Sequence, residues 1–260
     1  MKAGIETMKH YLQATLCVVA IITVLFTSES FAVQKESQAE KEANLKGQAL
    51  GGLFNRWTFD QQKPEEVPSE FSVITAGEAA SSAWTIQADA QAPSVPNILR
   101  VQSSCQSSSC YRLLIADKFQ YEYPDISVRI RFPSEGEVGQ GGLVIGFQDE
   151  KNFYAAIVNL ASKKLEVIRV LAGQVTVLAQ KDITPKAVDW HFLRVQRDTI
   201  ISKDVIETSF DGSLIQSIQD QSLGLGRVGI LAVGNSSLHF DNLYAIPLFS
   251  QRPLSSPAAY

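Results

Sequence analysis

The sequence predicts an all-β fold, a two-sheet antiparallel jelly-roll sandwich. Short apolar alternations separated by turn residues run through the chain from about Leu53 onward, and this period of two is typical of strands with one buried face. The end of the chain, 226–248, predicts two closing strands joined by a Gly-Asn-Ser-Ser turn. No helix beyond the N-terminal lead-in is required by the pattern.

The first 32 residues predict a signal peptide. Basic residues precede an apolar run from Leu12 to Phe26, and Ser-Phe-Ala then places small residues where a signal peptidase acts, so we expect cleavage between Ala32 and Val33. Initiation at Met8 would fit the same pattern. The alternative is a retained anchor, but a run of about 15 residues is shorter than the roughly 20 that span a bilayer. We therefore expect an exported protein, periplasmic or extracellular, without stable membrane insertion after cleavage.

Composition places the rest of the chain in one domain. The 260 residues carry 23 basic and 27 acidic side chains, a net charge of −4, and this mixed, mildly acidic balance argues against a nucleic-acid-binding surface. Residues 33–52 are polar and predict a mobile lead-in. Residues 53–250 are enough for one large β-sandwich, and 251–260 predict a disordered tail.

The expected strands follow in order. In the first with clear alternation, Ile126, Val128 and Ile130 point one way while the residues between them, including Arg129 and Arg131, point the other. Expected hairpins are 143–148 with 153–159, 164–171 with 174–180, and 205–210 with 214–218, and a lone strand covers 190–197. Asp-Gly at 211–212 is a strong two-residue hairpin signal. In the closing pair, Val228, Ile230, Ala232, Leu238, Phe240 and Asn242 are expected on the buried face.

Two cysteines remain after removal of the signal peptide. Cys105 and Cys110 flank a serine-rich turn, and in an oxidising compartment this spacing predicts a disulfide across a hairpin. The alternative is two free thiols. A metal site there would need further ligands, and the mature chain has only His191 and His239, which we expect to face solvent.

Several landmarks carry a family resemblance. They are Trp57-Thr-Phe-Asp60, Pro68-Ser-Glu-Phe71, Trp84 to Asp89, Gly141 to Phe147, Asp149 to Tyr154, Trp190 to Val195, Gly226 to Ile230 and Phe240 to Leu243. In this order they resemble the secreted concanavalin-A-like (lectin/glucanase type) and laminin-G-like jelly rolls, in particular the bacterial 3-keto-disaccharide hydrolase domain family. The resemblance spans residues 54–248. One departure is that the segment 153–157 lacks the Arg that relatives often carry.

The resemblance implies a module that binds or processes carbohydrate, with a glycan or small sugar as partner. It also implies Ca²⁺ as a candidate cofactor, for which Asp60 and Asp241 are the best ligands by motif; a turn or sheet-edge role is the alternative for both. A glycoside hydrolase of the keto-disaccharide type and a structural or protein-interaction sandwich are the alternative functions.

Catalytic residues remain unknown from the sequence. The Glu-x-Asp-x-x-Glu and Glu-x-Asp-x-Glu strands of jelly-roll glucanases are absent, although that alternation is what would place two glutamates on one face. Glu135 and Glu137 flank a glycine in an expected loop, and Asp204 and Glu207 would point to opposite faces of a strand. We interpret both pairs as solvated carboxylates.

A sugar-binding face combines an aromatic ring that stacks on the pyranose with polar groups that bond its hydroxyls. Arg129, Arg131, Gln148 and Tyr154 form the candidate patch, with Tyr154 as the stacking ring. The alternative is an ordinary solvated sheet face. The three tryptophans, Trp57, Trp84 and Trp190, are expected in the core.

Overall fold

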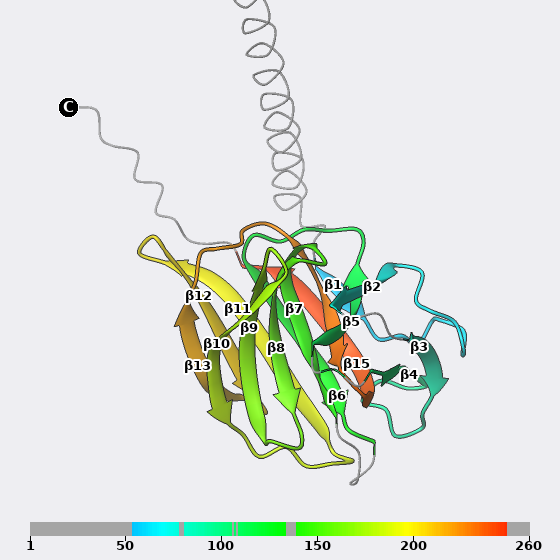
Figure 1. Ribbon diagram of the computed structural model, residues 1–260. Coiled ribbons are helices and arrows are strands. Elements are labelled where there is room, and N and C mark those ends of the chain that lie inside the picture. The colour runs from blue at the N-terminus through cyan, green and yellow to red at the C-terminus, as the bar shows by residue number, and fades with distance from the viewer. Residues whose placement is uncertain (1–53, 78–80, 106, 108, 134–138, 249–260) are drawn as a thin grey trace, which may run out of the picture. The chain divides into compact units, whose positions relative to one another are not determined.

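The computed structural model describes residues 54–77, 81–105, 107, 109–133 and 139–248 (Figure 1). The expected signal peptide with its Ala32–Val33 junction, the lead-in 33–52, the tail 251–260 and the pair Glu135 and Glu137 lie outside the described residues. The part of the chain that the structure describes holds no helix long and apolar enough to cross a membrane.

The described chain is folded into two antiparallel sheets, here called sheets A and B (Figure 1). Sheet A has the order β13-β12-β11-β6-β15-β4-β3, with β1 also paired to β15. Its strands are β1 (Asn55–Trp57), β3 (Ser81–Ala88), β4 (Asn97–Ser104), β6 (Pro124–Arg131), β11 (Trp190–Ile200), β12 (Lys203–Phe210), β13 (Ser213–Gln219) and β15 (Ser236–Pro247).

Sheet B has the order β10-β9-β8-β7-β14-β5-β2. Its strands are β2 (Phe71–Gly77), β5 (Cys110–Ala116), β7 (Gln140–Asp149), β8 (Asn152–Asn159), β9 (Lys164–Leu171), β10 (Gln174–Asp182) and β14 (Arg227–Val233). The chain is therefore an all-β, two-sheet antiparallel sandwich, as the sequence predicts.

The main core lies between the two sheets. Ile126, Val128 and Ile130 of β6 are fully buried in it, which confirms the predicted alternation of that strand. Trp84 of sheet A and Ile145 of sheet B belong to the same cluster. Burial of each such aliphatic side chain contributes about 1.5–3 kcal/mol, so this layer supplies most of the driving force for folding.

Sheet B is also buried on its other face. A second apolar cluster there includes Tyr111, Phe147, Phe153 and Leu231, none more than 7 % exposed. Its rings contact one another, with Phe153 6.0 Å from Tyr111 and 6.1 Å from Phe147 between centroids. The outer face of sheet B is therefore apolar and buried at this cluster, whereas polar side chains concentrate on the outer face of sheet A.

The predicted hairpins are confirmed. β7 pairs with β8, β9 with β10, and β12 with β13, the last pair meeting at Asp211 and Gly212. Both turn residues have positive φ, 49° and 82°, which is the conformation that Asp-Gly favours. The predicted disulfide is present as well: Cys105 and Cys110 are bonded, with Cα atoms 6.4 Å apart. The expectation that it lies across a hairpin is wrong, because β4 belongs to sheet A and β5 to sheet B, and the bond therefore closes the connection between the two sheets.

One expectation for the closing strands is wrong. The register of β15 against β6 shifts between Asp241 and Tyr244, and Asn242 has a φ of 49°. A bulge of this kind adds one residue to a strand and reverses the alternation beyond it. Leu243 is consequently buried in the core in the place expected for Asn242.

Candidate functional site

Polar and aromatic side chains form transverse rows on the outer face of sheet A. One row runs through Trp190 of β11, Arg131 of β6, His239 of β15 and Arg100 of β4, which are register partners in turn. The next row is Phe192, Arg129 and Asp241. The third is Arg194, Ser127 and Tyr244. Register partners project from the same face, so these side chains form one continuous surface, here called the arginine–aromatic face.

Two arginines of this face lie over aromatic rings of the neighbouring strand. The guanidinium of Arg131 is 4.5 Å from the ring centroid of Trp190, and that of Arg129 is 4.9 Å from Phe192. A guanidinium stacked on a ring keeps its N–H edge available while its plane is fixed. The pairs therefore hold both donors and apolar ring surface in a defined geometry.

Arg131 has further partners. Its Nη2 donates to Asp89 Oδ2 and lies 2.9 Å from His239 Nδ1. Burial, followed by the charge of Arg131, lowers the pKa of His239 to about 4, so the imidazole is neutral at pH 7 and its Nδ1 accepts the hydrogen bond. His239 is only 7 % exposed, which corrects the expectation that it faces solvent.

The third row is held by an ion pair at its end. Arg194 donates to both carboxylate oxygens of Asp125, at 2.7 and 2.5 Å, and Gln196 donates to the same carboxylate at 3.3 Å. In this bidentate geometry one edge of the Arg194 guanidinium is fully hydrogen-bonded to the Asp125 carboxylate. Arg194 is therefore neutralised within the sheet, unlike Arg129, for which no carboxylate partner occurs among the described residues.

A loop covers one end of the face. The N–H of Ser94 donates to Asp241 Oδ2 at 2.6 Å, and its hydroxyl donates to Asp60 Oδ2 at 2.5 Å. Asn97 donates its backbone N–H to Asp60 Oδ1 at 3.2 Å. The two carboxylates that the motif predicts as calcium ligands, from opposite ends of the sequence, are thus brought to a single serine.

Asp241 is fully buried. Burial raises its pKa to about 6, and the negative charge of Asp60 acts in the same direction, against the hydrogen bonds from the N–H groups of Ser94 and Asn242. A buried carboxyl whose pKa is raised beside a second carboxylate is stabilised in its ionised form by a nearby cation. The described residues contain no group of three or more His, Cys, Asp or Glu suited to a metal.

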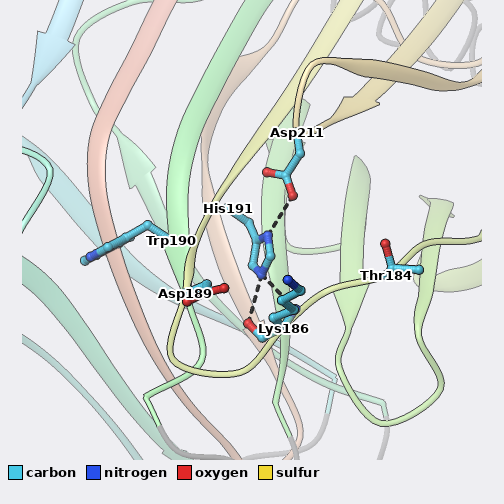
Figure 2. Close-up of a pocket in the computed structure, with 6 residues that line it drawn as sticks. All are labelled: Thr184, Lys186, Asp189, Trp190, His191 and Asp211. Atoms are coloured by element: carbon cyan, nitrogen blue, oxygen red, sulfur yellow. Dashed lines mark hydrogen bonds and ion pairs between the residues drawn. The ribbon is translucent and has the colours of Figure 1, made fainter.

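A shallow cleft of about 500 Å³ adjoins the face at Trp190 (Figure 2). Thr184, Lys186, Asp189, His191 and Asp211 line the rest of it. Trp190 thus belongs to both surfaces and is half-buried, which corrects its expected place in the core. Trp57 and Trp84 are in the core as expected.

His191 occupies the centre of this cleft but is already satisfied. Its Nδ1 is 2.7 Å from Asp211 Oδ2, and its Nε2 accepts the backbone N–H of Lys186 at 2.9 Å (Figure 2). The ring stacks on Phe210 at 5.0 Å and is only 5 % exposed, contrary to the expected solvent-facing position. Because both ring nitrogens have partners, His191 positions the loop 184–190 rather than offering a free base.

The predicted patch of four residues is divided by the fold. Arg129 and Arg131 lie on sheet A, whereas Gln148 and Tyr154 lie on sheet B. Gln148 is exposed at the end of β7 and donates to the carbonyl of Leu225 at 3.5 Å. Tyr154 is 1 % exposed and lies between the sheets. The expectation that Tyr154 stacks on a sugar is therefore wrong.

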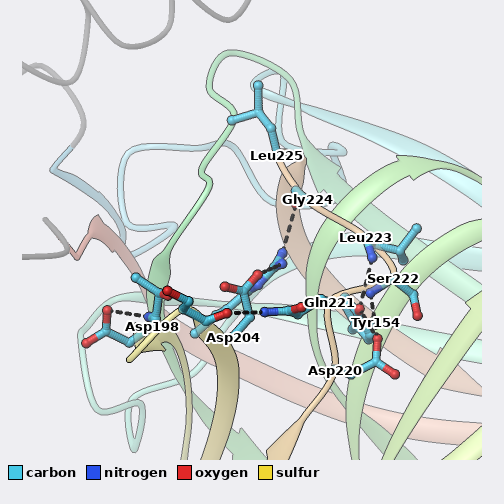
Figure 3. Close-up of polar contacts among 12 residues, drawn as sticks. Tyr154, Asp198, Asp204, Asp220, Gln221, Ser222, Leu223, Gly224 and Leu225 are labelled. Atoms are coloured by element: carbon cyan, nitrogen blue, oxygen red, sulfur yellow. Dashed lines mark hydrogen bonds and ion pairs between the residues drawn. The ribbon is translucent and has the colours of Figure 1, made fainter. Parts of the chain in front are cut away.

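Tyr154 belongs instead to a buried polar network (Figure 3). Its hydroxyl donates to Asp220 Oδ1 at 2.5 Å and accepts the N–H of Leu223 at 3.0 Å. Arg169 donates to the other oxygen of Asp220 at 2.6 Å. These bonds fix the crossover 220–226 between the sheets.

Asp204, interpreted from the sequence as a solvated carboxylate, is an ion-pair partner. It accepts a hydrogen bond from Arg197 at 2.5 Å, and that side chain also donates to the carbonyl of Gly224 at 3.0 Å. Arg197 is 2 % exposed. The pair therefore anchors the same crossover from the sheet A side.

Comparison with protein-family models and with curated protein sequences finds no match. Among solved structures, the chain is similar to the carbohydrate-binding module CBM66 from Bacillus subtilis, with a TM-score of 0.54 and 14 % identity over 68 % of this chain and 95 % of that one. It is also similar to the cellulose induced protein Cip1, with a TM-score of 0.53 and 12 % identity over 75 % and 98 %. At these identities the likeness shows a shared β-sandwich fold alone.

Proposed function

We propose that the protein is an exported carbohydrate-binding module whose ligand lies across the arginine–aromatic face. The observation that carries this proposal is the pairing of Trp190 with Arg131 and of Phe192 with Arg129 in adjacent rows. Rings supply the apolar surface that stacks on a pyranose, and fixed guanidinium groups supply donors for its oxygens. The sandwich fold shared with a carbohydrate-binding module supports the proposal at the level of fold.

The experiment is a glycan array on protein purified from a secreting host, followed by calorimetry with the best glycan. Trp190→Ala and Phe192→Ala should each weaken binding about tenfold, equivalent to about 1.4 kcal/mol. Phe54→Ala is the matched control, because that ring is 57 % exposed and precedes β1, outside the face. No binding to any glycan, or equal losses in all three variants with the melting temperature unchanged, would overturn the proposal.

A second candidate is a glycoside hydrolase of the keto-disaccharide type, the family that the sequence resembles. The observation in its favour is that Asp189 and Asp211 line the cleft beside Trp190, and Asp182 lines an adjoining one with Asp211. Asp211 is bonded to His191 and to the N–H of Phe192, whereas the carboxylates of Asp182 and Asp189 have no hydrogen-bond or ion-pair partner among the described residues. Release of sugar from a 3-keto-disaccharide by the native protein, lost in Asp189→Asn, would support this candidate over simple binding.

Export and calcium binding complete the proposal. The secreted protein should begin at Val33 by intact mass, and recovery only as a full-length membrane species would contradict export. Asp60 and Asp241, joined through Ser94, would hold Ca²⁺ at the edge of the face. There the ion would tie the loop 89–97 to β15 and so shape one end of the sugar-binding surface.

A further inference from the structure

The charges on the arginine–aromatic face do not balance. Asp89 neutralises Arg131, and Asp125 neutralises Arg194. Arg100 donates to the neutral amide of Gln102 at 3.0 Å, and Arg129 has an aromatic partner but no ion pair among the described residues. Two cationic side chains on neighbouring rows thus have no internal counter-charge in contact.

The nearest carboxylate to Arg129 along the register is already engaged. Asp241 faces Arg129 across the strand pair, but its two oxygens accept the N–H groups of Ser94 and Asn242 at 2.6 Å each. It is fully buried, next to Asp60. Its carboxylate is therefore turned toward the covering loop rather than toward the guanidinium.

Arg129 is nevertheless held in place. Its side chain is half-buried and stacks on Phe192, so little rotational freedom remains to be lost when a ligand binds. A planar guanidinium with a free N–H edge matches a carboxylate in a bidentate manner. A neutral sugar hydroxyl would use only one of these donors and would leave the charge uncompensated.

Resting on the proposed function, we infer that the ligand is an acidic glycan whose uronic acid carboxylate pairs with Arg129. Arg100, which shares a row with Arg131 two strands away, attracts a second carboxylate of the same polymer. The rings of Trp190 and Phe192 contact the sugar faces between these charged positions. The module therefore discriminates by charge as well as by shape.

The experiment compares polygalacturonate with its fully methyl-esterified form, which keeps the same backbone without the charge. Calorimetry at about 0.1 M salt should show binding of the acid at least about tenfold tighter than that of the ester. Arg129→Gln should reduce binding of the acid about tenfold and binding of the ester by a clearly smaller factor, so that the preference for the acid is largely lost. Arg227→Gln is the matched control, because it removes the same charge from sheet B, where Arg227 pairs with Asp117.

The results that would contradict this inference can be told apart. Equal binding of acid and ester would overturn the charge preference while leaving a carbohydrate-binding module intact. Equal losses in Arg129→Gln and Arg227→Gln, or binding of dextran sulfate as tight as that of polygalacturonate, would indicate attraction by net charge and overturn the carboxylate site. Failure of every polysaccharide, charged or neutral, would instead overturn the proposed function itself.

Discussion

Tyr154 shows at the scale of one residue how a polar tip is accommodated inside the sandwich. The ring packs in the core, and its hydroxyl both donates to Asp220 and accepts from the backbone of Leu223. Burial and the bond to Asp220 raise the pKa of Tyr154 to about 12, so the phenol remains protonated and donates at any ordinary pH. A buried hydroxyl without partners would cost free energy, whereas here it orders a crossover.

Tyr154→Phe removes both hydrogen bonds but keeps the ring. We expect a loss of about 2 kcal/mol in the free energy of unfolding, since the N–H of Leu223 is left without its acceptor, while Tyr154→Ala should cost about 3–5 kcal/mol. Chemical denaturation measures both. The sugar affinity of the folded Tyr154→Phe protein should not change. As a control, Tyr244→Phe should change the free energy of unfolding little, because the ring of Tyr244 is 36 % exposed. Weaker binding in a fully stable Tyr154→Phe protein would contradict this role.

Asp241 predicts a dependence of stability on pH. Its folded pKa of about 6 lies above the ordinary 3.8, so between these values the folded state binds more protons than the unfolded state. Its contribution to the free energy of unfolding is therefore present below about pH 4 and is lost as pH rises through 6, by up to about 3 kcal/mol. His239, with its pKa lowered to about 4, has the opposite effect, because its contribution to stability increases as the pH rises over the same range.

The comparison that isolates Asp241 is therefore with Asp241→Asn, in which His239 is unchanged. Without divalent cations, the stability of the native protein relative to this variant should fall between pH 4 and 6. Urea unfolding at several pH values measures the difference, and a constant difference across that range would show that the Asp241 carboxyl titrates normally.

At the scale of the strand, the alternation of apolar and polar residues predicts which face of the sheet a side chain occupies, but not which strands lie beside it. β6 has one apolar and one polar side, so its inward Ile126 and Val128 and its outward Arg129 follow from the sequence. β8 is buried on both sides, with Phe153 in one cluster and Tyr154 in the other. A strand with two buried faces carries no period-two signal, which is why Tyr154 is misplaced by sequence reasoning.

Pairing between distant strands accounts for the other error. Sequence order suggests that β6 adjoins β7, but β6 pairs with β11 and β15 while β7 pairs with β8 and β14. Only the fold brings Trp190 beside Arg131 and His239 beside Arg100. The outward parity of Trp190 relative to Leu193 was the one sequence signal available for its surface position.

The connection from β4 in sheet A to β5 in sheet B supports a prediction of modest disulfide stabilisation. Cys105 and Cys110 enclose a short loop, and the loop-closure model then gives about 2 kcal/mol. This connection has other supports, because the N–H of Gly234 donates to the carbonyl of Cys110 at 2.9 Å and Ser103 Oγ donates to the carbonyl of Gly234. Cys105→Ala should therefore lower the free energy of unfolding by no more than about 2 kcal/mol and leave the fold intact. Loss of the native circular dichroism spectrum in this variant would contradict that limit.

At the scale of the whole molecule, the two outer surfaces differ in kind. The outer face of sheet B carries buried apolar side chains such as Phe153 and Leu231, whereas the outer face of sheet A carries arginines, an imidazole and aromatic rings. Solvation of the charged side chains favours keeping the outer surface of sheet A open to water. This asymmetry supports the proposal that a ligand binds on sheet A, and the hydrogen bonds of Asp60 and Asp241 to Ser94 tie the covering loop to the edge of that sheet.

Calcium should therefore stabilise the whole sandwich by tying Asp60, at the start of the domain, to Asp241 in its last strand. A ligand that binds only the folded state at 100 times its dissociation constant adds about 2.7 kcal/mol, which raises the melting temperature of a domain of this size by about 5–10 °C. Thermal unfolding after EDTA treatment and again with excess CaCl2 measures the shift. Asp60→Asn should reduce it, and MgCl2 should not reproduce it because Mg²⁺ gives up its waters reluctantly. Equal melting temperatures with EDTA and with several millimolar CaCl2 would show that the two carboxylates serve the loop alone, through Ser94.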